Sequence, residues 1–171
     1  MPAFYLDASA IVKHYLPEAG SDVVSELLTA PPVADQFHTS VLSTVEVTSA
    51  LQRQVPAGRL DERSAHEALA AFRATLVAHF SVWPLAEDTV TAAVAVAEQH
   101  KLRAGDALHL ASALSIAALA PQPSGPALSR AEGLVLVSSD SELLGAAAAA
   151  GLVVLDPAAP GAGAILRQLR A

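Results

Sequence analysis

The N-terminal stretch constrains the fold most, because an apolar run of strand type changes directly into a helical pattern at a single carboxylate. Residues 3–7 form the strand candidate, and residues 9–16 carry apolar side chains at helical spacing. Asp7 closes the strand and is the only acid before Glu18. Two interpretations of Asp7 are open at this point. Its side chain caps the helix, or it belongs to a site at the carboxyl edge of a parallel sheet.

Strand and helix patterns alternate along the rest of the chain. Further strands are expected at residues 37–40, 80–85, 134–137 and 152–155. Helices are expected at residues 21–30, 42–54, 62–78, 87–100, 105–119 and 143–150. This alternation predicts an α/β fold, a three-layer sandwich in which helices flank a central, mainly parallel β-sheet.

The length of 171 residues is most simply that of one domain, residues 1–171, with a core at about 3–156. The stretch at about 120–132 is rich in Pro, Gly and Ser, and we predict that it is a surface excursion. The remainder, 157–171, is a C-terminal tail in which 165–169 have a helical pattern.

Composition narrows the possible chemistry. Hydrophobic residues make up 53% of the chain and aromatic residues only 4%, so the core is built from Ala, Val and Leu, and aromatic base-stacking surfaces are disfavoured. The net charge of −7 repels nucleic acid, so any nucleic-acid chemistry requires metal ions or a local basic patch. The lack of Cys excludes disulfides, zinc–thiolate sites and thiol catalysis. No run resembles a membrane span or a signal peptide, so the expected location is the cytoplasm.

Four acids stand alone among apolar or small residues: Asp7, Glu46, Asp106 and Asp140. Each also has a simpler explanation. Asp106 lies in the first turn of its expected helix, Asp140 can cap the helix that follows it, and Glu46 can pair with Arg53. Together they favour a site, because three of them would lie at strand ends or helix starts on the same edge of a parallel sheet.

Carboxylates that face a core are unfavourable unless a basic group or a metal ion compensates them. Oxygen ligands without Cys or a clear His pair favour a hard cation such as Mg²⁺ or Mn²⁺. Such an ion would offset the repulsion among the acids, activate a water and stabilise the leaving oxygen of a phosphodiester. We therefore predict that all four acids are metal ligands and catalytic residues.

Other polar residues are secondary candidates. The candidates for RNA contacts are Lys13, His14, Arg53, Lys101 and Arg103, although solvated charges or pairing with nearby acids explain each of them at least equally well. His109 lies three residues after Asp106, so the two side chains can meet on one helix face. We expect His109 to support the site rather than to bind metal. Glu142 is the runner-up ligand for the last position.

The motifs that carry these acids resemble the PIN domain, and most closely the VapC-type toxins of bacterial toxin–antitoxin pairs. The motifs are residues 6–13 (LDASAIVK), 45–47 (VEV), 102–111 (LRAGDALHLA) and 137–140 (VSSD). The likeness covers about residues 3–156, and its most specific motif is 102–111. It implies a metal-dependent endoribonuclease in which Asp7, Glu46, Asp106 and Asp140 form an acidic quartet. Ser9 would support the site by hydrogen bonding, and Ser139 is expected to support it as well.

The same resemblance implies partners. Members of this family usually form homodimers and cleave RNA. A small cognate antitoxin neutralises them by covering the site with its C-terminal segment. The other end of the antitoxin commonly binds operator DNA, so this chain would meet DNA only indirectly.

Two departures and two alternatives accompany the resemblance. The loop after residues 106–119 is long and Pro-rich, and the last motif reads Ser-Ser-Asp where Thr before the acid is more usual. A haloacid-dehalogenase-like phosphatase also begins with a strand ending in Asp, but it requires a second acid at the position of Ser9. A catalytically inactive PIN-like binding module is the other alternative, because a sequence does not measure turnover.

Overall fold

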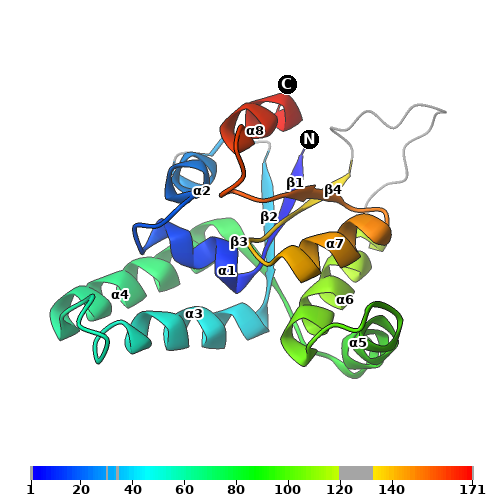
Figure 1. Cartoon of the computed structure of the whole chain (residues 1–171), viewed down its shortest axis with the longest axis horizontal. Coiled ribbons are helices and arrows are strands. Elements are labelled where there is room, and N and C mark those ends of the chain that lie inside the picture. The colour runs from blue at the N-terminus through cyan, green and yellow to red at the C-terminus, as the bar shows by residue number, and fades with distance from the viewer. Residues whose placement is uncertain (1, 30, 34, 120–132, 171) are drawn as a thin grey trace.

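A five-stranded parallel sheet forms the centre of the computed structural model, which describes residues 2–29, 31–33, 35–119 and 133–170 (Figure 1). The strand order is β3-β2-β1-β4-β5, and all four neighbouring pairs are parallel. The strands are β1 (Ala3–Leu6), β2 (Gln36–Ser40), β3 (Phe80–Trp83), β4 (Leu134–Val137) and β5 (Val153–Leu155). The predicted α/β sandwich with a parallel sheet is confirmed.

The two central strands are buried because helices cover both faces of the sheet. Successive side chains of a strand point to opposite faces. In β1, Phe4 and Leu6 therefore belong to one core cluster and Tyr5 belongs to the other. All four residues of β4 are buried in the same alternating way.

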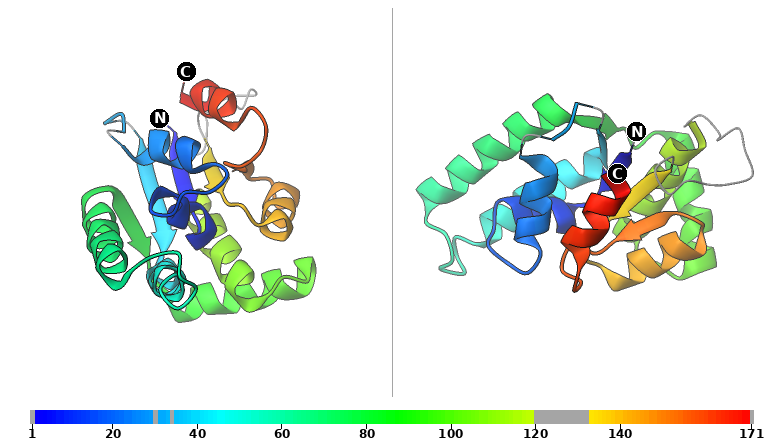
Figure 2. Two further views of the ribbon diagram at one scale, coloured as in Figure 1. Left: turned by 60° about the vertical axis from the view of Figure 1, so that its left-hand side comes forward. Right: turned by 90° about the horizontal axis from the view of Figure 1, so that it is seen from above.

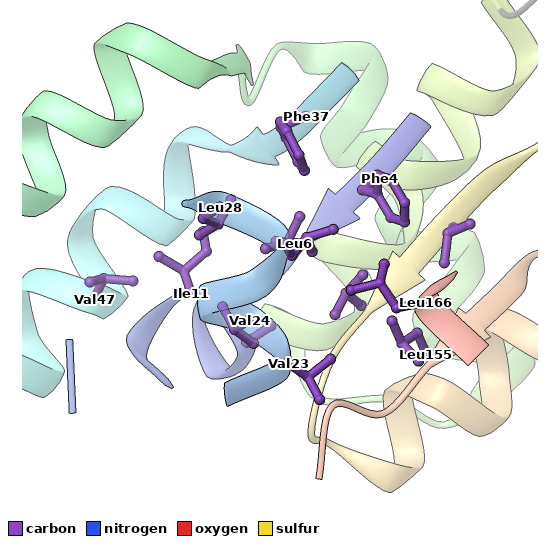
Figure 3. Close-up of a cluster of buried hydrophobic side chains, with 14 of the residues drawn as sticks. Phe4, Leu6, Ile11, Val23, Val24, Leu28, Phe37, Val47, Leu155 and Leu166 are labelled. Carbon is purple, nitrogen blue, oxygen red and sulfur yellow. The ribbon is translucent and has the colours of Figure 1, made fainter. Parts of the chain in front are cut away.

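Each face of the sheet has its own layer of helices (Figure 2). The first layer contains α1 (Ala8–Ile11), α2 (Ser21–Leu28), α3 (Val41–Arg53), α4 (Glu62–His79) and α8 (Ala162–Arg170). The second contains α5 (Glu87–His100), α6 (Ala104–Leu119) and α7 (Ser141–Ala149). Figure 3 shows the first core, where Leu6 of β1 lies among Val24, Leu28 and Ile11. The core is thus mainly aliphatic, as composition predicts.

The strand order positions a site. From β1 the chain proceeds to β2 on one side of β1, whereas β4 lies on the other side. In sheets of this kind, the crevice at the carboxyl ends of the strands where the order reverses is the usual ligand-binding position. Here that position lies between the ends of β1 and β4, where Asp7 and the segment 138–140 follow the two strands.

Several element boundaries differ from the sequence-based expectation. The helix expected at 9–16 is a short α1 followed by a 3-10 turn, η1 (Val12–His14). Pro17 disfavours helical backbone at the residue before it, which explains the early end. The tail helix is longer than expected and places Leu166 and Leu169 in the first core. The predicted excursion at 120–132 lies outside the described residues. Among the helices that the structure describes, none is long and apolar enough to cross a membrane.

Candidate active site

Asp7 is buried, with 4% of its surface exposed, and both of its carboxylate oxygens accept hydrogen bonds. Oδ1 accepts from the backbone N–H of Ala10 at 2.9 Å, which caps α1. The hydroxyl of Ser9 lies 2.8 and 2.9 Å from the two oxygens. Oδ2 also accepts from the hydroxyl of Ser138 at 2.8 Å. Burial raises the pKa of the Asp7 carboxyl above its ordinary value, and nearby His109 and these donors act in the opposite direction.

Serine side chains connect the ends of β1 and β4. Ser138 is fully buried, and its Oγ accepts from the backbone N–H of Asp140 at 3.0 Å while its hydroxyl donates to Asp7. The Oγ of Ser9 accepts from the backbone N–H of Ser139 at 2.9 Å. The expected support from the Ser139 side chain was wrong, because its Oγ is buried without a hydrogen-bond partner in the described structure. Ser138 takes that role instead, and Ser139 contributes only its backbone.

Asp140 and Asp106 lie at the starts of α7 and α6. Oδ1 of Asp140 caps α7 by accepting from the backbone N–H groups of Glu142 and Leu143, at 2.8 and 3.0 Å. Asp106 lies in the first turn of α6 and is partly buried. Partial burial, and then the neighbouring Asp140 carboxylate, raise the pKa of Asp106 above its ordinary value. The two acids are therefore close enough to repel each other.

Glu46 reaches the same place from the second turn of α3, which begins directly after β2 with Ser40 as its cap. Its Oε2 lies 2.8 Å from Nε2 of His109, a residue of α6 with only 2% exposure. Nδ1 of the same imidazole lies 2.9 Å from the hydroxyl of Tyr5, which is fully buried in β1. The expectation that His109 supports the site agrees with this geometry. The alternative explanation of Glu46, pairing with Arg53, does not apply here, because Arg53 donates to Ser49 at 3.1 Å.

A single open pocket of about 450 Å³ is lined by all four predicted acids. Its lining residues are Asp7, Ala8, Ser9, Val12, Val45, Glu46, Ser49, Ala50, Arg53, Asp106, His109 and Asp140. Arg53 is the only Lys or Arg among them. The sequence therefore predicted correctly which acids converge, although they come from positions far apart in the chain.

Two predicted RNA contacts lie elsewhere. Lys13 is buried, and its ammonium donates to Glu18 Oε1 at 3.0 Å and to the carbonyl of Ala19 at 2.9 Å. Its prediction as a substrate contact was wrong, because these partners hold it away from the pocket lining. Arg103 is exposed, lies 4.0 Å from the carboxylate of Glu142, and is not among the lining residues either. Glu142 is likewise outside the lining.

Two site residues, Ser138 and Tyr5, were missed by sequence reasoning. Ser138 is next to Ser139, which was selected from the sequence. The direction of the backbone at the end of β4 decides which of the two side chains points toward Asp7. Tyr5 gave no signal, because an aromatic residue in a buried strand is most simply explained as a core residue. Arg53, one of the candidate RNA contacts, does line the pocket, where it follows Glu46, Ser49 and Ala50 at helical spacing on α3.

The donor chemistry of the pocket suits a hard divalent cation, because the four acids offer only oxygen and bring like charges together. The side chains do not form a ready coordination shell. Within the described ranges, no three His, Asp or Glu side chains are placed so that they could hold a metal ion as they stand. Glu46, Asp106 and Asp140 are all partly exposed, so rotation of these side chains would be needed to complete a ligand set around the fixed Asp7.

Comparison with known proteins identifies the family. PAE2754 from Pyrobaculum aerophilum has 20% identity and a TM-score of 0.61, over 98% of this chain and 95% of that chain. VapC20 from Mycobacterium tuberculosis, described as a sarcin–ricin loop cleaving toxin, has 19% identity and a TM-score of 0.59, over 88% and 96%. A toxin–antitoxin complex from Klebsiella pneumoniae has 18% identity and a TM-score of 0.52, over 90% and 96%.

These identities show a common fold and nothing finer. Among curated proteins, none matches the chain. A family model described as the PIN domain matches residues 4–149, which include Asp7, Glu46, Asp106 and Asp140. Since that match spans most of the chain, the protein belongs to the PIN domain family.

Proposed function

We propose that this protein is a divalent-metal-dependent endoribonuclease and the toxin of a toxin–antitoxin pair. The observation that carries the proposal is the convergence of four carboxylates from β1, α3, α6 and the end of β4 on one open pocket. Family membership supports it. Two structurally similar proteins are described as a sarcin–ricin loop cleaving toxin and as a toxin–antitoxin complex, which supports the same assignment for this chain.

Asp7, Glu46, Asp106 and Asp140 would hold the metal, Mg²⁺ or Mn²⁺. When bound, the metal activates a water and stabilises the leaving oxygen of the phosphodiester. Asp7 is the rigid member, because Ser9, Ser138 and the N–H of Ala10 fix its orientation. Repulsion between Asp106 and Asp140 would be offset by a bound cation.

The other pocket residues would handle the substrate. Arg53 places the one guanidinium of the pocket lining on the same helix as Glu46, held by Ser49. A guanidinium matches a phosphate in charge and geometry. Arg53 would therefore bind an RNA phosphate beside the reacting one, which offsets locally the net charge of −7.

Cleavage of a structured RNA tests this proposal. Purified protein is incubated with Mg²⁺ or Mn²⁺, with and without chelator, beside Asp106→Asn. The matched control is Glu98→Gln, which removes one negative charge from an exposed position on α5. We expect cleavage that stops in chelator and in Asp106→Asn but persists in Glu98→Gln. Cleavage that survives chelation would refute the metal-dependent mechanism.

The two alternatives predict different results in the same assay. A phosphatase would hydrolyse a small phosphomonoester and leave RNA intact. The structure disfavours the phosphatase alternative. That alternative requires an acid two residues after Asp7, and this position holds Ser9, whose hydroxyl donates to Asp7. An inactive binding module would leave both substrates intact while still binding RNA.

The proposed partners are a small antitoxin and a second copy of the chain, and an RNA substrate would place the protein in the cytoplasm. Exposed valines support the homodimer. Val90 and Val94 are one helical turn apart on α5 with 45% and 56% exposure. Light scattering after size-exclusion chromatography tests the dimer, and loss of cleavage on co-expression with the product of an adjacent short reading frame tests the antitoxin.

A further inference from the structure

The carboxylate of Glu46 lies beside two residues of α6, His109 and Gly105. Its Oε2 lies 2.8 Å from Nε2 of His109. Its Oε1 lies where a Cβ on Gly105 would approach to 3.3 Å, which is closer than most real Cβ contacts. The side chain thus extends from α3 to α6, with one oxygen hydrogen-bonded to His109 and the other beside a position that has no side chain. The hydrogen bond to His109 restricts the orientation of this flexible side chain, and Gly105 leaves room for Oε1.

His109 is itself fixed from its other ring nitrogen. The hydroxyl of Tyr5 lies 2.9 Å from Nδ1, and the two rings meet edge to face with centroids 6.0 Å apart. An ionised carboxylate only accepts hydrogen bonds, so Nε2 must carry a proton toward Glu46. In the neutral imidazole, Nδ1 then accepts, and the phenol of Tyr5 supplies the proton. Burial raises the pKa of the Tyr5 phenol, which keeps that proton in place.

The chain of contacts runs from the rigid sheet to the pocket. Tyr5 and His109 are 0% and 2% exposed, whereas the Glu46 side chain is 37% exposed and lines the pocket. Two buried groups therefore orient one accessible carboxylate. Asp7 has a comparable arrangement, in which Ser9 and Ser138 hold its oxygens.

We propose that Tyr5 and His109 are positioning residues that orient the Glu46 carboxylate for cation binding. Nε2–H of His109 donates to Oε2, so Oε1 would remain available to a metal ion. This proposal rests on the proposed metal-dependent function. Hydrogen-bonding partners of metal ligands typically contribute about 10–100-fold to metal affinity or activity when they are removed.

Three variants separate positioning from packing. Tyr5→Phe keeps the ring and removes only the hydroxyl that contacts Nδ1. His109→Leu removes the donor to Glu46. His109→Gln places an amide N–H as many bonds from the backbone as Nε2, so it can restore that donor. The matched control is Leu110→Val, which disturbs the adjacent, fully buried residue of α6 without changing a hydrogen bond.

The first measurement is Mn²⁺ affinity, by calorimetry, of variants shown by circular dichroism to be folded. We expect His109→Leu to bind about 10–100-fold more weakly than the wild type. Tyr5→Phe should be weakened by a smaller factor, and His109→Gln should recover most of the loss. Leu110→Val should bind as the wild type does. Equal affinity in His109→Leu and the wild type, or an equal loss in Leu110→Val, overturns the positioning role.

The second measurement needs no metal. Long-range ¹H–¹⁵N NMR of the metal-free protein reports which ring nitrogen of His109 carries a proton. We expect a proton on Nε2 and a Nδ1 resonance that changes in Tyr5→Phe. An imidazole protonated only at Nδ1 overturns the inference. If the wild type binds no Mn²⁺, the proposed function is refuted, and the positioning role that rests on it is refuted as well. If Mn²⁺ affinity does not depend on His109, only the positioning role is refuted.

Discussion

Replacing Asp7 by Asn or by Ala separates its two roles, as helix cap and as buried charge. Asn is as good a cap as Asp, and its amide oxygen can accept from the N–H of Ala10 as Oδ1 does. It also removes a buried negative charge. Ala removes the cap as well and leaves Ser138, whose hydroxyl donates to Oδ2 at 2.8 Å in the wild type, without a partner at position 7, whereas the amide N–H of Asn can donate to the Ser138 Oγ instead.

The expected difference in the free energy of unfolding between the two variants follows from these contacts. Loss of an N-cap costs about 1 kcal/mol, and loss of one further hydrogen bond costs about 1 kcal/mol. Asp7→Ala should therefore be about 2 kcal/mol less stable than Asp7→Asn. For a chain of this size that difference corresponds to about 4–8 °C in Tm. In chelator, Asp7→Asn should be at least as stable as the wild type, because burial disfavours the ionised carboxylate.

Urea unfolding followed by circular dichroism, at pH 7.5 with chelator, measures all three proteins. Cleavage of RNA should be lost in both variants. Equal stability of Asp7→Ala and Asp7→Asn would mean that the cap and the Ser138 contact contribute nothing to the fold. A variant Asp7→Asn that unfolds more than 1 kcal/mol below the wild type would mean that the charge itself stabilises the structure, contrary to the effect expected from burial.

Three further variants test neighbouring features. Gly105→Ala should preserve or raise stability by up to about 1 kcal/mol in urea unfolding, yet slow cleavage, because the added Cβ would lie 3.3 Å from Oε1 of Glu46. Arg53→Ala should weaken RNA binding, measured by fluorescence anisotropy in chelator, and lower its salt dependence by about one phosphate contact, whereas the exposed Arg73→Ala should not. Burial lowers the pKa of His38 in β2 below 6.5, so stability should fall as pH drops below about 6.5, and His38→Gln should flatten that fall in urea unfolding between pH 7.5 and 5.5.

Much of the fold was predictable because hydrophobic periodicity reports which residues face a core. The strand at 134–137 is apolar throughout, and the structure shows it paired on both sides and covered on both faces. The short α1 was harder to anticipate. The apolar spacing at 9–16 suits a helix, but Pro17 sets where helical backbone must end, and the last turn tightens to a 3-10 conformation.

The acids of the site were predictable for a different reason. An isolated carboxylate at the end of a core strand, or at the start of a helix that packs on the sheet, has few acceptable surroundings. Strand order then decides which of these positions meet. Asp7 and Asp140 follow the neighbouring strands β1 and β4, so they share one edge of the sheet.

The supporting residues were not predictable to the same degree, because they depend on side-chain direction. Ser138 and Ser139 differ by one position, and in extended backbone that difference turns a side chain to the opposite side. Lys13 is near Asp7 in sequence, but the turn of η1 directs it to Glu18 and Ala19. The contact between Tyr5 and His109 joins residues 104 positions apart, and no local pattern encodes it.

The two interpretations of Asp7 are compatible because of how its donors are shared. Oδ1 accepts from the backbone of Ala10 and Oδ2 accepts from Ser138, while the single hydroxyl of Ser9 lies within 2.9 Å of both oxygens. One hydroxyl has one proton, so Ser9 can donate fully to only one oxygen at a time. If a cation takes one oxygen, Ser9 can keep its bond to the other, and the cap of α1 stays intact. The carboxylate can therefore change its ligand without releasing the helix that it begins.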